Sequence, residues 1–370
     1  MSDQDKKQAP KRRKKGDRAD IGRMKPLKKK TGGNTKPAVT LKSVAELVGL
    51  TASTVSAVLN SSSASRSVPK HTQARILEAA RALDYRPNFF ARSLRVKRTY
   101  MIGVILEEIG DAYGSLVISG IERYLREQNV FFLTVAHRHD KKLLASYSTV
   151  LRERGVEGFI TVDTILSEEP SLPTVAVAGH RRIKGVTNIV PDHRLAASLA
   201  LTHLVDLGHE QIAFMKGSKL SADSADRWNA ICEVAARLGI HMRQELIVEL
   251  KGVDPTPNLG YPFAKQLLER KQPFTALFAY NDISAIGSIC AFQEVGLRVP
   301  DDISVVGFDD IQSAAYITPP LTTVRQPLLK VGEIAARTLL GRIEGRMKYV
   351  PEITVEPELV VRKSTARPRC

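Results

Sequence analysis

One stretch of this sequence has hydroxyl side chains at a density and spacing suited to binding another molecule. The stretch, TASTVSAVLN at 51–60, also carries Val55, Val58 and Leu59 at helical spacing. Ser and Thr are mediocre helix formers, so their number needs a reason beyond helix formation. On the outer face of a short helix, hydroxyls can donate to DNA phosphates and reach base edges. The alternative is a surface helix whose Ser and Thr only cap and solvate it.

The charge distribution favours DNA binding. Residues 1–98 contain 24 Lys and Arg against 7 Asp and Glu, whereas residues 99–370 contain 31 against 32. The excess behind the net charge of +16 therefore lies in the first quarter of the chain. This asymmetry is typical of a polyanion-binding segment joined to a neutral globular body.

The elements around the hydroxyl-rich stretch predict a helix-turn-helix headpiece over 38–86. A first helix ends at Gly49, Thr51 caps a second, and Pro69 starts a third. The residues expected to face their common core are Val44, Leu47, Val48, Val55, Leu59, Ile76, Leu77, Ala80 and Leu83.

The segments on either side of the headpiece are basic. Residues 1–37 have few large apolar side chains and predict a disordered tail, which either contacts DNA phosphates or only solubilises the chain. Residues 87–98 predict a hinge, in which Asn88 caps a helix reaching Leu94 that is too short to be stable alone. The basic residues at one end of the hinge are Arg92, Arg95, Lys97 and Arg98, which suggests a phosphate backbone as its template.

Residues 99–370 alternate short apolar strands with amphipathic helices, which indicates an α/β core. The predicted strands are 101–106, 130–135, 158–162, 173–178, 211–215, 245–249, 275–279 and 303–308. Their number predicts two doubly wound parallel-sheet lobes, covered by helices on both faces. Because ligands bind outside the carboxyl ends of such strands, two facing lobes would enclose a small molecule.

Composition gives expectations about the compartment. The three cysteines, Cys232, Cys290 and Cys370, have no metal-like spacing and indicate a reducing environment. The basic start of the chain is not followed by an apolar signal region, and no run of about 18 apolar residues occurs. We therefore expect a cytoplasmic protein without a membrane partner.

Four longer blocks resemble a known family. They are TLKSVAELVGLTASTVSAVLN, RILEAARALDYRPNFFARSLR, LGHEQIAFMKG and VPDDISVVGFDDIQSAAYITPPLTTVRQP, and they occur in family order between Thr40 and about Ala366. With them the chain resembles the lactose/galactose repressor (LacI/GalR) family of bacterial transcription regulators. The resemblance implies a headpiece that reads operator DNA, a hinge helix, and a periplasmic-binding-protein-like core that dimerises and binds an effector.

The resemblance also implies DNA-contacting residues. The base-reading positions fall on Ala52, Ser53 and Ala57, and the phosphate-holding positions on Thr51, Thr54, Ser56 and Asn60. Arg92 belongs to the basic hinge, and Leu94 matches an apolar wedge inserted into the minor groove, although a dimer-interface leucine is the alternative. Many members carry a larger polar or basic residue where this chain has Ala57, so the operator sequence does not follow by analogy.

For the effector, the resemblance points to Arg227, Asn281, Asp282 and Asp309, whose groups suit vicinal hydroxyls or carboxylates. Without the family, Asn281 and Asp309 read equally well as helix N-caps. The opposite lobe departs from the family: 111–114 reads DAYG where many members have Asn-Pro-Phe-Phe, and Ala178 replaces an acidic residue. Tyr113 would either stack on a ligand ring or fill the lobe interface. A sugar is therefore only the starting expectation.

The sequence is interpreted as a ligand-controlled transcription regulator, expected to be a repressor. It would bind a pseudo-palindromic operator as a homodimer in the nucleoid-associated cytoplasm of a bacterium and take a sugar or related metabolite as effector. No leucine heptad follows the last strand, so no tetramerisation helix is expected.

The alternatives are an enzyme or a periplasmic sugar-binding protein on the same core. The motifs GxGxxG, GxxxxGK[ST] and GxSxG are absent, and the histidine pairs at 137/139 and 203/209 lack further ligands, so we expect no enzyme, cofactor or metal. The basic headpiece argues against the periplasmic protein.

Overall fold

A computed structural model describes residues 39–60, 62–86, 93–94, 96–179, 181–252 and 254–369. The chain forms two compact units that divide between residues 92 and 93, and each is described by itself. The predicted basic tail, and Asn88, Arg92 and Arg95 of the predicted hinge, lie outside the described residues.

Within its described residues, 39–60 and 62–86, the first unit is a headpiece of three α-helices. Its elements are α1 (Leu41–Val48), α2 (Ala52–Leu59), the 3-10 helix η1 (Ser63–Ser67) and α3 (Lys70–Ala82). Each early boundary has a local cause: Thr40 accepts a hydrogen bond from the backbone N–H of Ser43, Gly49 ends α1 at φ 67°, and Thr51 caps α2. The predicted helix-turn-helix is therefore confirmed.

The core of the headpiece is narrower than predicted. Val44, Val55 and Ile76 are fully buried, as expected. Leu47 and Leu77 were wrongly assigned to it, because they are 59% and 40% exposed. Packing of three short helices against one another buries only one stripe of each. The small residues Ala45, Ala79 and Ala80 fill the contact between them.

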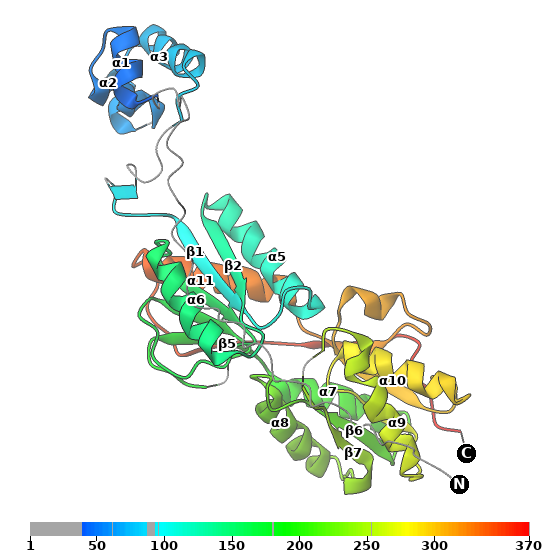
Figure 1. The fold of residues 1–370 in the computed structure, drawn as a ribbon. Coiled ribbons are helices and arrows are strands. Elements are labelled where there is room, and N and C mark those ends of the chain that lie inside the picture. Colours follow the sequence, from blue (N-terminus) through cyan, green and yellow to red (C-terminus); the bar gives the residue numbers. More distant parts are fainter. Residues whose placement is uncertain are drawn as a thin grey trace, which may run out of the picture. The chain divides into compact units, whose positions relative to one another are not determined.

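The second unit contains two lobes, each built on a six-stranded sheet (Figure 1). The first lobe has the strand order β11-β5-β4-β3-β1-β2, and all its strands are parallel. The second lobe has the order β12-β10-β9-β8-β6-β7, and only β12 is antiparallel. The predicted pair of doubly wound lobes is confirmed.

The strands and helices of the first lobe are β1 (Met101–Leu106), α5 (Ala112–Glu127), β2 (Phe131–Ala136), α6 (Lys141–Glu153), β3 (Phe159–Val162), β4 (Thr174–Val177), β5 (Val186–Pro191), α11 (Leu328–Ile343) and β11 (Glu352–Val355). Those of the second lobe are α7 (His193–Asp206), β6 (Ile212–Lys216), α8 (Ser224–Arg237), η2 (Gln244–Leu246), β7 (Ile247–Glu249), η3 (Pro257–Leu259), α9 (Tyr261–Glu269), β8 (Ala276–Phe278), α10 (Asp282–Glu294), β9 (Ser304–Asp309), η4 (Gln312–Ala315), β10 (Thr322–Arg325) and β12 (Glu358–Val360).

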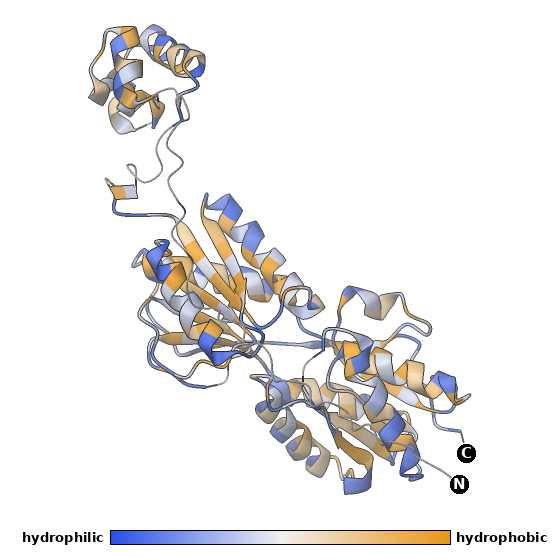
Figure 2. Ribbon diagram, viewed as in Figure 1, coloured by the Kyte–Doolittle hydropathy of each residue, from blue (hydrophilic) through white to orange (hydrophobic). Residues whose placement is uncertain are grey.

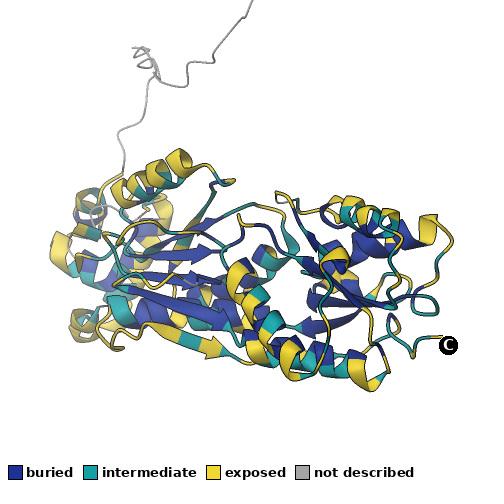
Figure 3. Cartoon of the chain, turned by 90° about the horizontal axis from the view of Figure 1, so that it is seen from below, coloured by how far each residue is buried: buried dark blue, intermediate teal, exposed yellow. Residues whose placement is uncertain are grey.

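Apolar side chains fill the space between each sheet and its helices (Figure 2). In the first lobe α5 and α11 contribute to one core and α6 lies beside the other. In the second lobe α9 and α10 contribute to one core and α7 and α8 to the other. The central strands of both sheets are buried and the outer helix faces are exposed (Figure 3), as is usual for sheets covered on both faces.

The helices α5 and α11 cross at two glycines. A Cβ on Gly120 would lie 2.0 Å from the carbonyl oxygen of Leu329, and one on Gly332 would lie 2.1 Å from that of Val117. The two backbones are therefore in direct contact, which ties α11, late in the chain, to the first lobe.

Four strands were missing from the sequence prediction: β5, β10, β11 and β12. β5 and β10 carry buried polar residues, and these are satisfied by partners distant in sequence: Thr187 donates to the carbonyl of Val350 at 2.6 Å, and Thr323 donates to Asp282 at 2.5 Å. β11 and β12 are short edge strands that are not buried. Neither kind has the continuous apolar run used to find the others.

The missing strands reveal three crossings between the lobes. The chain passes from β5 to α7, returns from β10 to α11, and passes again from β11 to β12 (Figure 1). The crossing segments are thus the covalent hinge of the core.

Among the described residues, no single helix has the length and apolar character needed to cross a membrane; α1 and α2 meet that test only as a pair bent by 108°.

Candidate functional site

The exposed start of α2 presents hydroxyl groups. Thr51, Ala52 and Ser53 are exposed, and the hydroxyl of Thr51 lies 2.8 Å from that of Ser53 and 2.9 Å from that of Thr54. The free backbone N–H groups and the positive end of the helix dipole lie at the same end. This surface combines donors with a favourable field for phosphate.

The other residues predicted to contact DNA lie in different environments. Thr54, Ala57 and Asn60 are half-buried. Ser56 is only 8% exposed, and its side chain accepts a hydrogen bond from Nδ2 of Asn60 at 3.2 Å, so the structure places it inside the headpiece. In the second unit Leu94 is helical and 81% exposed.

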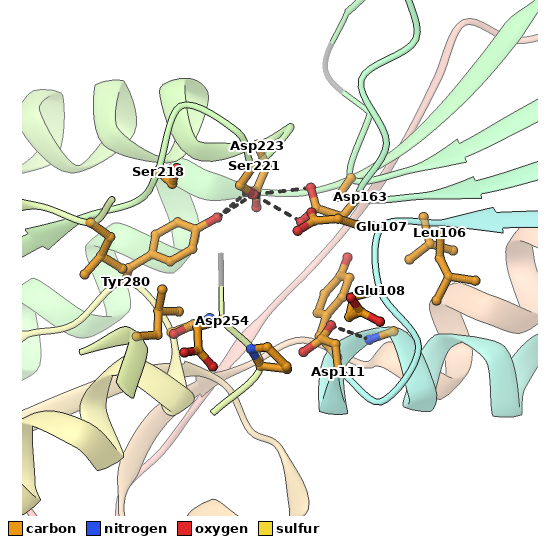
Figure 4. Close-up of a pocket in the computed structure, with 18 of the residues that line it drawn as sticks. Leu106, Glu107, Glu108, Asp111, Asp163, Ser218, Ser221, Asp223, Asp254 and Tyr280 are labelled. Atoms are coloured by element: carbon orange, nitrogen blue, oxygen red, sulfur yellow. Dashed lines mark hydrogen bonds between the residues drawn. The ribbon is translucent and has the colours of Figure 1, made fainter. Parts of the chain in front are cut away.

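A cavity of about 310 Å³ lies between the two lobes of the core. Its lining comes from loops that follow strands of both sheets (Figure 4). Four of the residues predicted from sequence to contact the effector line it, namely Tyr113, Arg227, Asn281 and Asp309. The fifth, Asp282, was wrongly assigned: it is fully buried and accepts from the hydroxyl of Thr323 and the N–H of Ile311.

Arg227 on α8 forms the second-lobe wall of the cavity. Its guanidinium pairs with Asp223, donates to the carbonyl oxygen of Tyr280 at 2.8 Å, and stacks 3.8 Å from the ring centre of Phe308. Tyr280 in turn donates its hydroxyl to Asp223 at 2.8 Å. Arg227 is only 5% exposed, so this network holds its side chain in one orientation.

Hydrogen bonds cross the cavity from lobe to lobe. Asp163, which follows β3 in the first lobe, accepts from the backbone N–H of Ala222 at 2.9 Å and from the hydroxyl of Ser221 at 3.2 Å. Both donors belong to the loop between β6 and α8 in the second lobe. Asp163 therefore links the lobes at the cavity wall.

Burial and the neighbouring charge of Asp163 favour a proton on Glu107. Burial, followed by the charge of Asp163, raises the pKa of Glu107 from 4.5 to about 9, and the protonated carboxyl hydrogen-bonds to Asp163. Burial and then Asp223 raise the pKa of Asp163 to about 6. The Nε2 atom of His139 lies against the same carboxyl of Glu107, and burial lowers the pKa of this histidine. Two adjacent carboxyls thus carry roughly one negative charge near neutral pH.

Asp309 connects the cavity with one of the segments that cross between the lobes. It is 6% exposed at the end of β9, and its Oδ1 accepts from Nε2 of Gln326 at 2.7 Å. Gln326 lies in the crossing from β10 to α11. Burial raises the pKa of Asp309 well above its ordinary value, while Arg227 lowers it.

Several cavity residues have a left-handed backbone. The non-glycine residues with positive φ in the lining are Arg138, His139, Asp163, Ala178 and Asp309. They lie at or just after the carboxyl ends of β2, β3, β4 and β9. Such strain persists where the surrounding structure holds it, and it is frequent at ligand sites.

Sequence reasoning missed several lining residues, chiefly Glu107, Asp163, Ser221, Asp223 and Tyr280. A signal existed for the first two. Glu107 directly follows the predicted strand 101–106, and Asp163 directly follows 158–162. Because parallel strands end at one edge of a sheet, their carboxyls could have been grouped. Nothing local in the sequence marks Ser221 and Asp223. Their loop approaches Glu107 and Asp163 only in the folded core.

Comparison with known proteins connects both sites with gene regulation. The model of bacterial regulatory proteins of the lacI family matches residues 40–88, and the model of a periplasmic binding protein-like domain matches residues 201–365. The transcriptional repressor PurR of Haemophilus influenzae is 32% identical over 338 residues, which cover 88% of this chain and 98% of the relative. PurR of Erwinia tasmaniensis is 33% identical over 337 residues, covering 88% and 97%.

The chain belongs to the LacI family. Solved structures of this family share its fold. The lac repressor dimer bound to operator and the anti-inducer ONPF has a TM-score of 0.78 at 26% identity and covers 89% of this chain and 99% of its own. The regulator CelR in complex with cellobiose has a TM-score of 0.65 at 26% identity, covering 88% and 99%.

Membership in the LacI family decides the class of function. The protein is a transcriptional repressor with an effector-binding core and not an enzyme. Its helix-turn-helix lies in the part matched by the lacI model, and the second-lobe side of the cavity lies in the part matched by the binding-protein model.

The proton on Glu107 makes stability depend on pH. Glu107 binds a proton in the folded protein up to about pH 9 but releases it near its ordinary pKa of 4.5 when unfolded. The folded state therefore holds more protons, so the free energy of unfolding falls as pH rises between these values, by up to about 1.4 kcal/mol per pH unit. Glu107→Gln should flatten this dependence, measured by chemical denaturation at several pH values. Glu153→Gln on the exposed face of α6 is the control, and equal slopes in all three proteins would refute the proton on Glu107.

Proposed function

We propose that this LacI-family repressor is a homodimer, that it binds a pseudo-palindromic operator, and that a small polar effector in the cavity controls its operator affinity. The supporting observation is that one cavity is lined by both lobes and bridged by Asp163 to Ser221 and Ala222. A ligand that contacts both walls favours one lobe arrangement over another. A change at the three crossing segments would then alter the hinge that leads to the headpiece.

For the operator, we propose that the start of α2 lies in the major groove. Ala52, Ser53 and Ala57 would contact base edges, while Thr51, Thr54 and Asn60 would hold phosphates. Ser56 would support α2 rather than contact DNA, since it is buried. Arg92 and the exposed Leu94 would act at the central minor groove, where an apolar wedge kinks the duplex. Such a regulator works with DNA, hence in the cytoplasm.

For the effector, we propose a small hydroxylated metabolite, a sugar or a related compound. Arg227, Asn281 and Asp309 supply donors and acceptors on the second-lobe wall, and Tyr113 supplies an aromatic ring from the first. The similarity to a regulator solved with cellobiose favours this size and polarity of ligand. Burial raises the pKa of Tyr113 well above its ordinary value, so its hydroxyl stays a donor.

For the dimer, exposed apolar side chains offer contact surfaces on both lobes. Phe131 on the edge strand β2 is 73% exposed, and Tyr316 in the second lobe is 79% exposed. Exposed apolar side chains that adjoin one another are typical of surfaces that another chain covers. Phe131 has such a neighbour in Leu133, which is 39% exposed on the same face of β2. The similarity to the lac repressor dimer favours a second copy as the partner.

Selecting bound sequences from a random duplex pool at about 150 mM salt, which suppresses phosphate-only binding, tests the operator proposal. We expect an enriched pseudo-palindrome with a flexible central step. On that operator Leu94→Ala should weaken binding by about tenfold or more, or about 1.4 kcal/mol, with a smaller loss on random DNA. The control is Val96→Ala, an exposed helical neighbour. Equal losses on both DNAs would rule out the wedge.

Arg227 is the residue for testing the effector site. Arg227→Ala should abolish the effect on operator affinity of any compound that shifts it in the unchanged protein, while DNA binding persists. Since removing one partner of a buried ion pair can cost about 3–5 kcal/mol, Arg227→Lys is measured beside it. Arg237→Ala, on the exposed end of the same helix, is the matched control. A normal response in both Arg227 variants would place the effector elsewhere.

Sedimentation equilibrium tests the dimer. Phe131→Glu should shift the mass from two chains to one, because it buries a charge in the proposed interface. Val361→Glu, at a position that is 58% exposed, should leave the mass unchanged. A single-chain mass for the unchanged protein would contradict the proposal.

A further inference from the structure

We infer that the cavity between the lobes takes a small organic cation, a polyhydroxylated amine such as an amino sugar, whose positive charge lies among the carboxyl groups of Glu107, Asp163 and Asp309. The inference rests on the proposed function in one respect: it takes this cavity as the effector site. It goes further by assigning the charge of the ligand.

The first support is the charge of the cavity wall. The described lining residues include the seven carboxyl groups of Glu107, Glu108, Asp111, Asp163, Asp223, Asp254 and Asp309, but among Lys and Arg only Arg138 and Arg227. Both arginines are already paired: Nε of Arg138 lies 3.3 Å from Glu108, and Arg227 pairs with Asp223. The other five carboxyl groups have no Lys or Arg ion-pair partner in the described part of the chain.

The second support is a buried carboxyl group on the cavity wall. Asp309 is 6% exposed and lines the cavity, and its Oδ1 accepts from Nε2 of Gln326. Burial raises the pKa of Asp309, and a cation placed beside it would lower that pKa again by stabilising the carboxylate. An ammonium group supplies three N–H donors together with the opposite charge.

The hydroxyl groups of the ligand have a complementary partner. Nε of Arg227 is buried and has no hydrogen-bond acceptor among the residues that the structure describes. A hydroxyl or ring oxygen on the ligand would accept from it. The ligand therefore needs an oxygen acceptor as well as a cation.

The proton between Glu107 and Asp163 marks the place of the positive charge. Without a ligand, that proton offsets one of two adjacent negative charges. The charged and titratable groups around Glu107 are Asp163, Asp111, Glu108 and His139, with Asp223 beyond Asp163. Because nearly all of them are acidic or neutral, an arriving ammonium would form the ion pair and release the proton to solvent.

Other ligand charges fit less well. A phosphate or carboxylate would meet five carboxyl groups and no unpaired Lys or Arg among the described lining residues. A metal ion alone would leave most of the 310 Å³ unfilled, and no group of three or more ligating side chains in the described residues could hold one. A neutral sugar would leave the acidic wall without a counter-charge.

The test uses the full-length protein and related polyhydroxylated compounds that carry a positive charge, no charge or a negative charge. Isothermal titration compares D-glucosamine, D-glucose and D-glucose 6-phosphate, then the galactose and mannose series, then N-methylglucamine against sorbitol, with calcium chloride alone as a separate arm. We expect an amine to bind at least about tenfold more tightly than its neutral and anionic counterparts, or about 1.4 kcal/mol. Tighter binding of a neutral or anionic compound, or of calcium alone, would overturn the inference. So would the absence of amine binding in every series.

Two variants and a proton count locate the charge. Asp309→Asn should weaken the amine by about tenfold or more and leave the neutral analogue unchanged. Titration of N-methylglucamine, an alkylamine that is already protonated at about pH 7.5, in buffers of different ionisation enthalpy should show about one proton released per amine bound, and none in Glu107→Gln. Glu153→Gln on α6 should match the unchanged protein in both measurements. Equal weakening of both compounds by Asp309→Asn would show that the positive charge of the ligand does not lie beside Asp309. Equal proton release in the unchanged protein and Glu107→Gln would show that it does not displace the proton of Glu107.

Operator binding separates this inference from the proposed function. An amine that binds the free protein and shifts its operator affinity supports both. An amine that binds without changing operator affinity supports the ligand class and contradicts the proposed control. A neutral or anionic compound that controls the operator while amines do not contradicts the ligand class and leaves the proposed function standing.

Discussion

The core depends on the contact that Asp163 makes with Ser221 and Ala222 across the cavity. Two parallel sheets meet with their carboxyl ends facing each other, and here a carboxylate of one lobe accepts hydrogen bonds from a loop of the other. Such charge-assisted bonds are stronger than neutral ones when water is excluded. The contact therefore gives the lobes a defined relative position, while the chain joins them through only three crossings.

The same arrangement concentrates negative charge in a small volume. Glu107 and Asp163 directly follow β1 and β3, Asp309 is the last residue of β9, and the sheet topology brings these strand ends to one cavity. Burying several carboxylates together is unfavourable unless each is compensated. The structure compensates them in three ways: by the Arg227–Asp223 ion pair, by backbone and hydroxyl donors to Asp163, and by the proton on Glu107.

The cavity is also connected with the segments that cross between the lobes. Asp309 bonds to Gln326 in the second crossing, so an atom facing the ligand lies one hydrogen bond from a segment that joins the lobes. The third crossing, between β11 and β12, adds a strand to each sheet within a few residues. A shift of one lobe must therefore bend backbone that belongs to both sheets.

The sequence by itself determined the headpiece helices, the α/β character of the core and the family, because local signals carry them. Thr40, Gly49 and Thr51 set helix ends through bonds to their own neighbours, and the apolar strands show as continuous runs. Arg227, Asn281 and Asp309, which the family resemblance indicated for the effector site, line the cavity, whereas Asp282, which it also indicated, is buried away from it. Only the tertiary structure decided that Leu47 and Leu77 stay exposed and Ser56 is buried, since this depends on where neighbouring helices cross. It also decided which carboxyl groups meet, because Glu107, Asp163 and Asp223 lie far apart in the chain. Their hydrogen bonds and the raised pKa values of Glu107 and Asp163 arise only when these groups are buried together.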